Sequence, residues 1–409
     1  MQRTSSGRVC PGRLSGAVPV ALVLLLLLVL LPLAAGCGST EAGAAGSATT
    51  SSAATGAAAD SQGSATTTPA SPEGGGAEMS AATVVVTDQA GRQHSVPDPI
   101  ETVYCASPAG TNLMYMLAPE LLIGWNVTPT ALEKEFIPEQ YRKVIGLGGW
   151  YGKNTTGNVE EIIKRDPDVV FSLGDLDEAA VSEADRIQGL LDIPVIMVDG
   201  SLVNSGQALR YIGGLLGREA RAEELAAYCD DVIAEAQGNT ATLAASDRVR
   251  VYYAEGTEGL NTDPEGSMHT EVLELVGGAN VAQVELSSGY GMSPVSFEQV
   301  LLWDPDVILV ASDPAEESNV YEQITTSQTW SDITAVANHR VYQIPRGPFD
   351  WFDRPPSMSR ILGVRWLGNL LYPDLYPYDM EDEVRAFYTL FYHLDLSDAQ
   401  LEKLMSRAR

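Results

Sequence analysis

The amino-acid sequence predicts an α/β protein made of two similar βα lobes bridged by one long helix. The main observation is an internal repeat, because residues 159–171 (VEEIIKRDPDVVF) are echoed by residues 297–309 (FEQVLLWDPDVIL). Glu160 and Glu298 are equivalent in the two copies, 298 − 160 = 138 positions apart. In each copy a helix-like run meets Asp-Pro-Asp, which ends a helix, and a strand-like apolar run follows. Two such lobes usually bind a ligand between them.

Residues 1–36 have the layout of an export signal, since three arginines and no acidic residue precede an apolar run from 17 to 35. The end of this run, Leu33 to Cys37, resembles a bacterial lipobox, although Ala34 stands where that motif prefers leucine. Cys37 would then be acylated and become the mature N-terminus. An uncleaved membrane-spanning helix is the alternative. Both place the protein on the outer side of a membrane.

Residues 37–80 are almost entirely Ala, Gly, Ser and Thr, which predicts a flexible tether with an average span of about 35–40 Å. The formal net charge of the chain is −29, and loss of the three leader arginines lowers it to −32. This acidity argues against nucleic acid or anionic lipid as a partner. Simple solubility is the plainer meaning of the charge.

The remaining chain alternates helix-like and strand-like segments in two blocks. A hairpin opens the first block, and a Glu/Ala/Leu-rich segment without proline joins it to the second. A break at residues 395–398 interrupts the amphipathic tail. The predicted parts are an N-terminal lobe (82–215), a bridging helix (218–245), a C-terminal lobe (247–376) and a C-terminal helical segment (377–409).

This layout resembles the cobalamin and ferric-siderophore class of substrate-binding proteins of ABC importers, the class III fold. The phrases that carry the resemblance are TVVVTDQAGRQHSVPDPIETV, NVEEIIKRDPDVVF, VSFEQVLLWDPDVILV, SMHTEVLELVGGANVA and RAFYTLFYHLDLSDAQLEKL. The resemblance covers nearly everything after the tether. It implies a monomeric, lipid-anchored protein without a cofactor. Such a protein captures an iron chelate, a corrinoid or a haem-like ligand and delivers it to an ABC permease with ATPase subunits.

Two glutamates are the candidate contacts with the permease. Asn158 and Ser296 fit helix N-caps within capping boxes, which places Glu160 and Glu298 in exposed first turns. Acidic residues are common in first turns for structural reasons alone. In the resembled family one such glutamate per lobe docks onto permease arginines, so the resemblance implies this role for both residues.

Loops after strand-like runs are the candidate ligand site, because ligands bind at strand ends in such sheets. Their flat side chains suit a large chelate, and Arg354 or Arg346 could pair with its negative groups. Packing between the lobes is the alternative for each aromatic ring. The candidate rings are Trp150, Tyr151, Tyr290, Trp351 and Phe352.

Other chemistry is weakly indicated. His269 could ligate a metal held in an organic complex, but it also fits the start of a helix. No His, Asp or Glu residues stand at metal-ligand spacing, and no enzyme motif is present. Cys105 and Cys229 fit buried free thiols better than a disulfide. A tethered enzyme, a metallochaperone or a surface sensor on the same two-lobed scaffold remains an alternative function.

Overall fold

The computed structural model describes residues 82–151, 156–287, 291–312 and 319–409. The chain divides into two compact units, residues 1–75 and 76–409, and every described residue belongs to the second unit. The predicted export signal, Cys37, the whole of the predicted tether and Tyr290 lie outside the described residues.

The second unit opens with the predicted hairpin, in which β1 (Ala82–Thr87) pairs antiparallel with β2 (Gln93–Asp98). Asp88 organises the turn, since its carboxylate accepts hydrogen bonds from the backbone N–H of Ala90 and Arg92. The same carboxylate accepts the backbone N–H of Met197, which fixes the hairpin to the neighbouring sheet.

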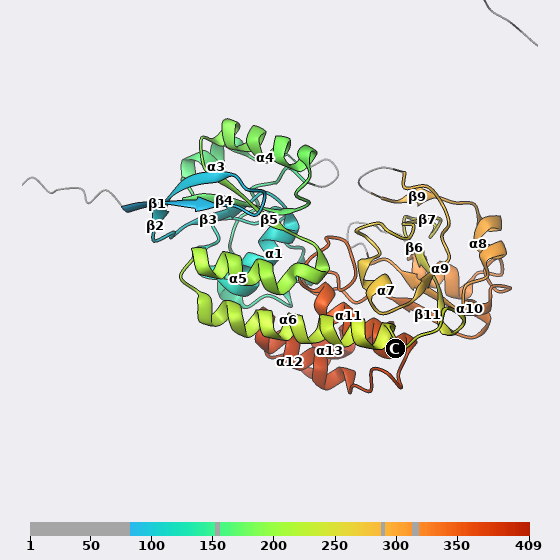
Figure 1. The fold of residues 1–409 in the computed structure, drawn as a ribbon. Helices are drawn as coiled ribbons and strands as arrows, with labels where there is room; N and C mark the ends of the chain where they lie inside the picture. The colour runs from blue at the N-terminus through green and yellow to red at the C-terminus, as the bar shows by residue number, and fades with distance from the viewer. Residues whose placement is uncertain (1–81, 152–155, 288–290, 313–318) are drawn as a thin grey trace, which may run out of the picture. The chain divides into compact units, whose positions relative to one another are not determined.

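The N-terminal lobe is built on a parallel sheet of strand order β3 (Val103–Cys105), β4 (Val169–Gly174) and β5 (Val195–Asp199). Figure 1 shows α3 and α4 on one side of this sheet and α1 and α5 on the other. The 3-10 turns of this lobe are η1 (Pro119–Leu121), η2 (Glu139–Tyr141) and η3 (Leu202–Asn204). Its helices are α1 (Pro108–Leu117), α2 (Ala131–Lys134), α3 (Val159–Arg165), α4 (Glu178–Leu191) and α5 (Ser205–Leu215).

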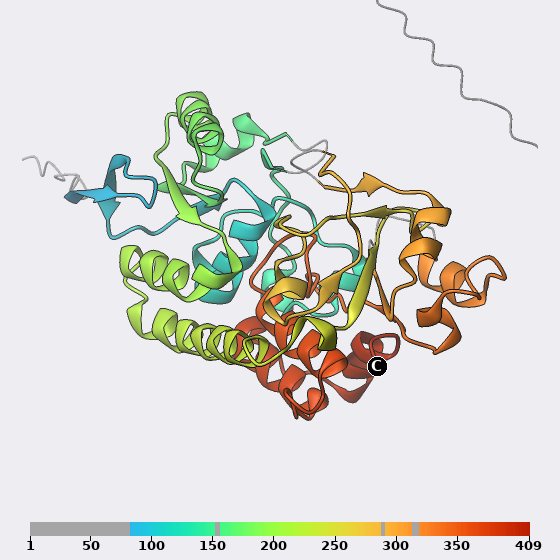
Figure 2. The same ribbon diagram turned by 45° about the vertical axis from the view of Figure 1, so that its right-hand side comes forward.

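The bridging helix is α6 (Glu219–Thr240), which is 22 residues long. In Figures 1 and 2 it runs from beneath the N-terminal lobe toward the C-terminal lobe. Its buried residues recur at helical spacing and form one apolar face. They are Ala222, Leu225, Ala226, Cys229, Val232, Ile233 and Ala236.

The C-terminal lobe has a parallel sheet of order β11 (Val341–Gln343), β10 (Val307–Val310), β6 (Arg250–Ala254) and β8 (Ala279–Asn280). A short antiparallel pair, β7 (Asn261–Thr262) with β9 (Ser293–Pro294), lies beside it. The lobe begins after the 3-10 turn η4 (Ala245–Asp247). Its helices are α7 (Glu271–Leu275), α8 (Phe297–Trp303), α9 (Val320–Thr326) and α10 (Thr334–Ala337).

The chain ends in three helices, α11 (Arg360–Leu371), α12 (Met380–Tyr392) and α13 (Asp398–Met405). The break predicted at residues 395–398 is present, but α12 already ends at Tyr392 because His393 adopts the left-handed conformation, with φ of 56°. Ser397 then caps α13 in a capping box with Gln400. Figure 2 shows these helices, in red, packed along α6.

The internal repeat has a structural cause in both lobes. Asp166 and Asp304 end α3 and α8 in the left-handed conformation, with φ of 47° and 43°. Asp168 then accepts the backbone N–H of Thr102 at 2.8 Å, and Asp306 accepts that of Arg250 at 3.0 Å. Each Asp-Pro-Asp therefore ends a helix and also holds the start of the neighbouring strand.

One hydrophobic core, here called the central core, serves both lobes. Alternate strand residues face it, such as Val169 and Phe171 of β4 and Val307 and Leu309 of β10. Residues of α1, α5, α6, α11, α12 and α13 complete it. The residues between them face separate outer clusters covered by α3 and α4 or by α8, α9 and α10. Two βα lobes bridged by a long helix, the predicted fold class, are confirmed.

Cys105 and Cys229 are free and fully buried in the central core. Burial raises the pKa of both thiols, so both stay protonated and unreactive at neutral pH. The prediction of buried free thiols is confirmed.

Truncating Phe387 to alanine should lower the free energy of unfolding by about 3–5 kcal/mol. Its ring is fully buried in the central core and stacks on Phe391, with ring centroids 4.2 Å apart. Because one core serves both lobes, urea unfolding followed by circular dichroism and tryptophan fluorescence should give one coincident transition. Leu302→Ala, at an 84% exposed position, is the control. Separate transitions for the two probes in the unmodified chain would contradict a common core.

Candidate functional site

A cavity of about 130 Å³ lies at the carboxyl ends of β6, β10 and β11 in the C-terminal lobe. Parallel strands commonly present their ligand sites at this end. The loops that follow the three strands supply most of its wall, and polar side chains predominate in it. The lining residues are Tyr253, Glu255, Gly256, Met292, Ala311, Ser312, Arg346, Asp350 and Arg354.

Arg346 connects the cavity to the N-terminal lobe. Its Nη2 donates to Glu133 Oε1 at 2.9 Å, and its Nη1 donates to the carbonyl oxygen of Arg354 at 2.8 Å. Glu133 is held in place by a capping box with Thr130 at the start of α2. All lining residues belong to the C-terminal lobe, and the pair of Arg346 with Glu133 links this wall to the N-terminal lobe.

Arg354 lies among three carboxyl groups that are fully buried. Its Nε donates to Glu255 Oε1 at 2.5 Å and lies 3.2 Å from Asp353 Oδ2. Its Nη2 donates to Asp263 Oδ2 at 2.7 Å. The carboxylate side chains have no exposed surface, whereas the Arg354 side chain is 29% exposed. Carboxyl groups thus outnumber the guanidinium that holds them.

Burial changes the protonation of this cluster. It raises the pKa of Glu255 to about 9, and Asp263 adds to the rise while Arg354 opposes it. Burial also raises the pKa of Asp350 to about 6, against the opposing effects of Arg346 and nearby backbone N–H groups. At neutral pH the proton on Glu255 therefore offsets part of the negative charge that the cavity wall would otherwise carry.

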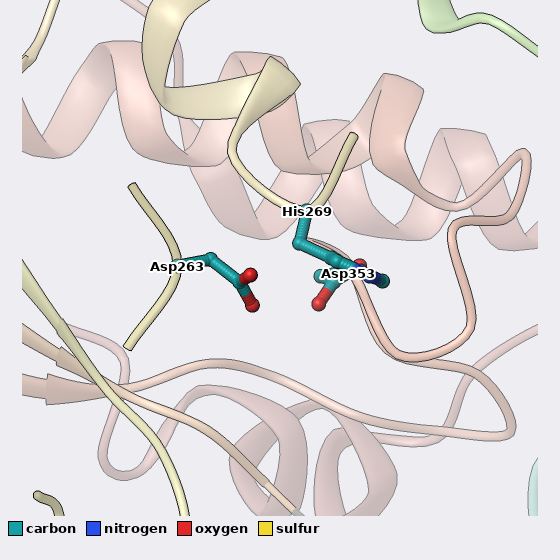
Figure 3. Close-up of side chains that lie close together, drawn as sticks. All are labelled: Asp263, His269 and Asp353. Atoms are coloured by element: carbon teal, nitrogen blue, oxygen red, sulfur yellow. The ribbon is translucent and has the colours of Figure 1, made fainter. Parts of the chain in front are cut away.

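His269 joins this cluster through Asp353. Its Nδ1 lies 2.5 Å from Asp353 Oδ1, and its backbone N–H donates to Ser267 Oγ. It lies just before α7, as the sequence indicated. Figure 3 shows Asp263, His269 and Asp353 pointing toward one another. Each has one possible metal-ligand atom within 4.8 Å of those of the other two.

Trp351 and Phe352 differ from the expectation that their rings face a ligand. Both are buried in the central core, with exposed fractions of 0% and 1%. Trp351 packs edge-on against Trp366, and Phe352 packs against Tyr253 with ring centroids 4.8 Å apart. The central core continues beneath this loop, so both rings are buried in the core. They anchor this loop and leave its polar residues to line the cavity.

Trp150 and Tyr151 lie in the N-terminal lobe and are half-buried. Trp150 packs edge-on against Tyr104, and the Tyr151 hydroxyl lies 3.1 Å from Ser172 Oγ on β4. Neither residue is part of the cavity wall that the described residues form. Among the predicted ligand residues that the structure describes, Arg354 and His269 come together, whereas the rings of Trp150, Tyr151, Trp351 and Phe352 do not join them.

Glu160 and Glu298 are exposed in the first turns of α3 and α8. Ser296 and Gln299 form the complete predicted capping box. The Asn158 side chain accepts a hydrogen bond from the backbone N–H of Glu161, which is one of the two bonds of the predicted capping box. The N-cap of α3 does not include the second bond, from the Glu161 side chain back to the Asn158 backbone. Glu161 instead lies 3.3 Å from Lys164 in an ion pair, which explains the difference.

Sequence reasoning missed the acidic residues of the cavity. Loops after strand-like runs were predicted to face the ligand, but their acidic residues were not singled out. The acidic residues that line or support the cavity are Glu133, Glu255, Asp263, Asp350 and Asp353. The sequence feature that could have revealed them is Glu255, an acidic residue that directly follows the buried strand segment Val251–Ala254. A charged residue in that position must be paired or protonated.

Comparison with known proteins agrees with this architecture. The family model described as periplasmic binding protein matches residues 117–347, more than half of the chain. The chain belongs to the periplasmic binding protein family. A solved ABC transporter solute-binding protein from Sulfurospirillum deleyianum is 34% identical, with a TM-score of 0.72. The match covers 79% of this chain and 99% of that one.

Two curated relatives of this family member have different described ligands. The molybdate-binding protein of Haemophilus influenzae is 26% identical over 342 residues, which cover 75% of this chain and 90% of the relative. The vitamin B12-binding protein of Salmonella choleraesuis is 27% identical over 271 residues, covering 66% and 89%. This periplasmic binding protein is thus a substrate-binding component of an ABC importer and not an enzyme.

This role implies permease and ATPase partners and a small-molecule ligand on the extracytoplasmic side of a membrane. In the part of the chain that the structure describes, no helix combines the length and apolar character needed to cross a bilayer.

Replacing Glu133 by glutamine should lower the free energy of unfolding by about 1–3 kcal/mol, because Arg346 would keep a largely buried charge with a weaker partner. Arg346→Met in the same chain should recover part of this loss. A double-mutant cycle by urea unfolding measures the coupling. Strictly additive losses would show that the interlobe pair contributes nothing.

Proposed function

We propose that this substrate-binding protein captures a metal chelate with anionic groups, of the iron–siderophore, corrinoid or haem-like class, between the lobes at the cavity of the C-terminal lobe. The observation that carries the proposal is the pair Arg346 and Arg354 set among buried carboxyl groups in the cavity wall. Guanidinium groups suit the carboxylate or phenolate edge of a chelate. The surrounding carboxyl groups favour the positive charge of a metal centre.

The size of the cavity limits how such a ligand would bind. About 130 Å³ is smaller than the roughly 300–1,000 Å³ of pockets that enclose drug-sized ligands. In this conformation the anionic edge of the chelate enters the cavity and meets the arginines. The body of the chelate then lies between the lobes.

An oxyanion is the second candidate ligand. Two arginines in a small polar cavity suit a tetrahedral anion, and one relative is described as molybdate-binding. Against this ligand stand the carboxyl groups that already occupy Arg354. The two candidate ligands differ in the side chains that bind them. The oxyanion needs only the arginines, whereas the chelate also uses the carboxyl groups.

We further propose that Glu160 and Glu298 dock onto the permease. Both are exposed, occupy equivalent positions of the repeat and follow the N-cap of a seven-residue helix. An exposed aliphatic residue follows each one, Ile163 at 44% and Leu301 at 42% exposure. These residues have the same 138-residue separation, 301 − 163, so each lobe presents a matched acidic and apolar contact.

Anchoring through an acylated Cys37 completes the proposal, because it keeps the binding protein near its permease. Its support is the lipobox-like sequence at the end of the apolar leader and the tether-like composition that follows. An increase in mass matching a diacylglyceryl group on a chain that starts at Cys37 would establish this anchor.

Ligand identity is tested by isothermal titration of the purified chain with ferric siderophores, cobalamin, haemin, molybdate and tungstate. We expect saturable binding of one chelate class and a loss of at least about tenfold, or about 1.4 kcal/mol, in Arg346→Met. Arg385→Gln, which removes an arginine paired with Asp398 on the terminal helices, is the control. Binding of the oxyanions alone would replace the chelate proposal by the second candidate.

Permease docking is tested by reversing both charges, Glu160→Arg with Glu298→Arg. Uptake by cells that carry the cognate permease should be abolished while ligand affinity stays unchanged, because the two glutamates lie outside the cavity. The matched control reverses Glu219 and Asp332, which are also exposed and give the same change in net charge. Normal uptake by the Glu160/Glu298 variant would refute docking and favour a sensor role, and reduced affinity would assign these residues elsewhere.

A further inference from the structure

We propose that Asp263, His269 and Asp353 form a binding site for a divalent transition-metal ion behind the cavity wall (Figure 3). One imidazole nitrogen and two carboxylate oxygens lie within 4.8 Å of one another. This mixed set suits zinc, nickel, iron(II) or manganese better than magnesium or calcium, which prefer oxygen alone. The site goes beyond the proposed function, since it requires neither the chelate nor the permease.

Three separate segments bring the ligand residues together. Asp263 directly follows β7, His269 precedes α7, and Asp353 lies in the loop before α11. Their residue exposures are 0%, 7% and 0%. Such convergence of buried charged and titratable side chains is uncommon in a protein interior unless they are paired or bind a metal.

The backbone around the ligand residues is also fixed. The Asn280 side chain donates to the carbonyl oxygen of Asp263 at 2.8 Å. The backbone N–H of Asp353 donates to Asp350 Oδ1 at 3.0 Å, and that of His269 donates to Ser267 Oγ at 3.2 Å. Supporting hydrogen bonds of this kind orient the ligands at metal sites.

Two buried polar atoms of this cluster have no hydrogen-bond partner among the described residues. They are His269 Nε2 and Glu255 Oε2, on residues that are 7% and 1% exposed. Such atoms are uncommon in folded interiors and point to a missing partner. Because His269 Nδ1 faces Asp353 Oδ1, a metal shared by these two residues would bind Nδ1 in place of a proton, and Nε2 would then carry the proton.

The charges of the cluster also favour a cation. Arg354 is the cation in direct contact with Glu255, Asp263 and Asp353. Asp350 faces the same cavity, and Arg346 is already paired with Glu133. Among the described residues, three carboxyl groups therefore surround one guanidinium group, and a divalent ion would compensate the excess.

Metal binding is tested on the full-length chain, purified in mild detergent without a histidine tag and stripped with EDTA. Zn²⁺, Ni²⁺, Mn²⁺, Mg²⁺ or Ca²⁺ is added alone, and bound metal is measured after desalting. We expect one equivalent of a transition metal per chain and a higher melting temperature, with no retention of Mg²⁺ or Ca²⁺. His269→Gln and Asp263→Asn should each weaken binding at least tenfold. His339→Gln and Asp332→Asn remove exposed groups of the same lobe and should bind normally.

X-ray absorption of the metal-loaded, unmodified chain gives a second readout that does not depend on the folding of a variant. One imidazole among oxygen ligands supports the site, whereas none or several would overturn it. Failure of the unmodified chain to retain a transition metal, or unchanged binding in folded His269→Gln, would also overturn it and show that the Arg354 ion pairs alone satisfy the acids. Binding of the chelates is measured in a separate titration. The metal site and the chelate ligand can therefore each be refuted without the other.

Discussion

The structure depends on one constraint, which is that the inner faces of both sheets belong to one continuous apolar core. Val169 and Phe171 of β4 and Val307 and Leu309 of β10 reach a single apolar core together with α6 and the terminal helices. The inner faces of the two lobes are therefore buried in the same core as the bridging and terminal helices. A core that continues between the lobes opposes a wide hinge motion, because opening would expose apolar surface at roughly 25 cal/mol per Å². The two lobes are thus held at a defined separation before any ligand arrives.

The central core also determines where the functional residues lie. Trp351 and Phe352 are buried in it, and neighbouring residues of the same loop, Asp350 and Arg354, line the cavity. A mobile loop would lose conformational entropy on binding, whereas this loop is fixed by two large buried rings. The aromatic residues therefore act as anchors for the polar ones. Preorganised polar groups of this kind can recognise a ligand without a large rearrangement.

The sequence was informative where signals are local and weak where they are spatial. The repeat, the hairpin, the long helix and the helix ends at the two Asp-Pro-Asp segments all follow from composition and periodicity. The family was recognisable from the same segments. By contrast, Asp263, His269 and Asp353 come from three loops up to 90 residues apart, so no spacing rule can group them. The burial of Trp351 and Phe352 was equally invisible, since a loop rich in prolines and rings suits both a ligand and a core.

The balance of charges at Arg354 bears on the choice between the two candidate ligands. A free oxyanion would have to compete with Glu255 and Asp263 for the same guanidinium, and any displaced carboxylate would stay buried without a counter-charge. A ligand that carries both a cation and anionic groups avoids this cost, because its cation can compensate the carboxylates while its anionic edge meets Arg346. A metal ion bound near Arg354 would have the same effect on the carboxylates, and would make the arginine more available to an anion. The carboxylates near Arg354 therefore favour a positive charge, and Arg346 favours a negative group. A metal chelate supplies both charges in one molecule.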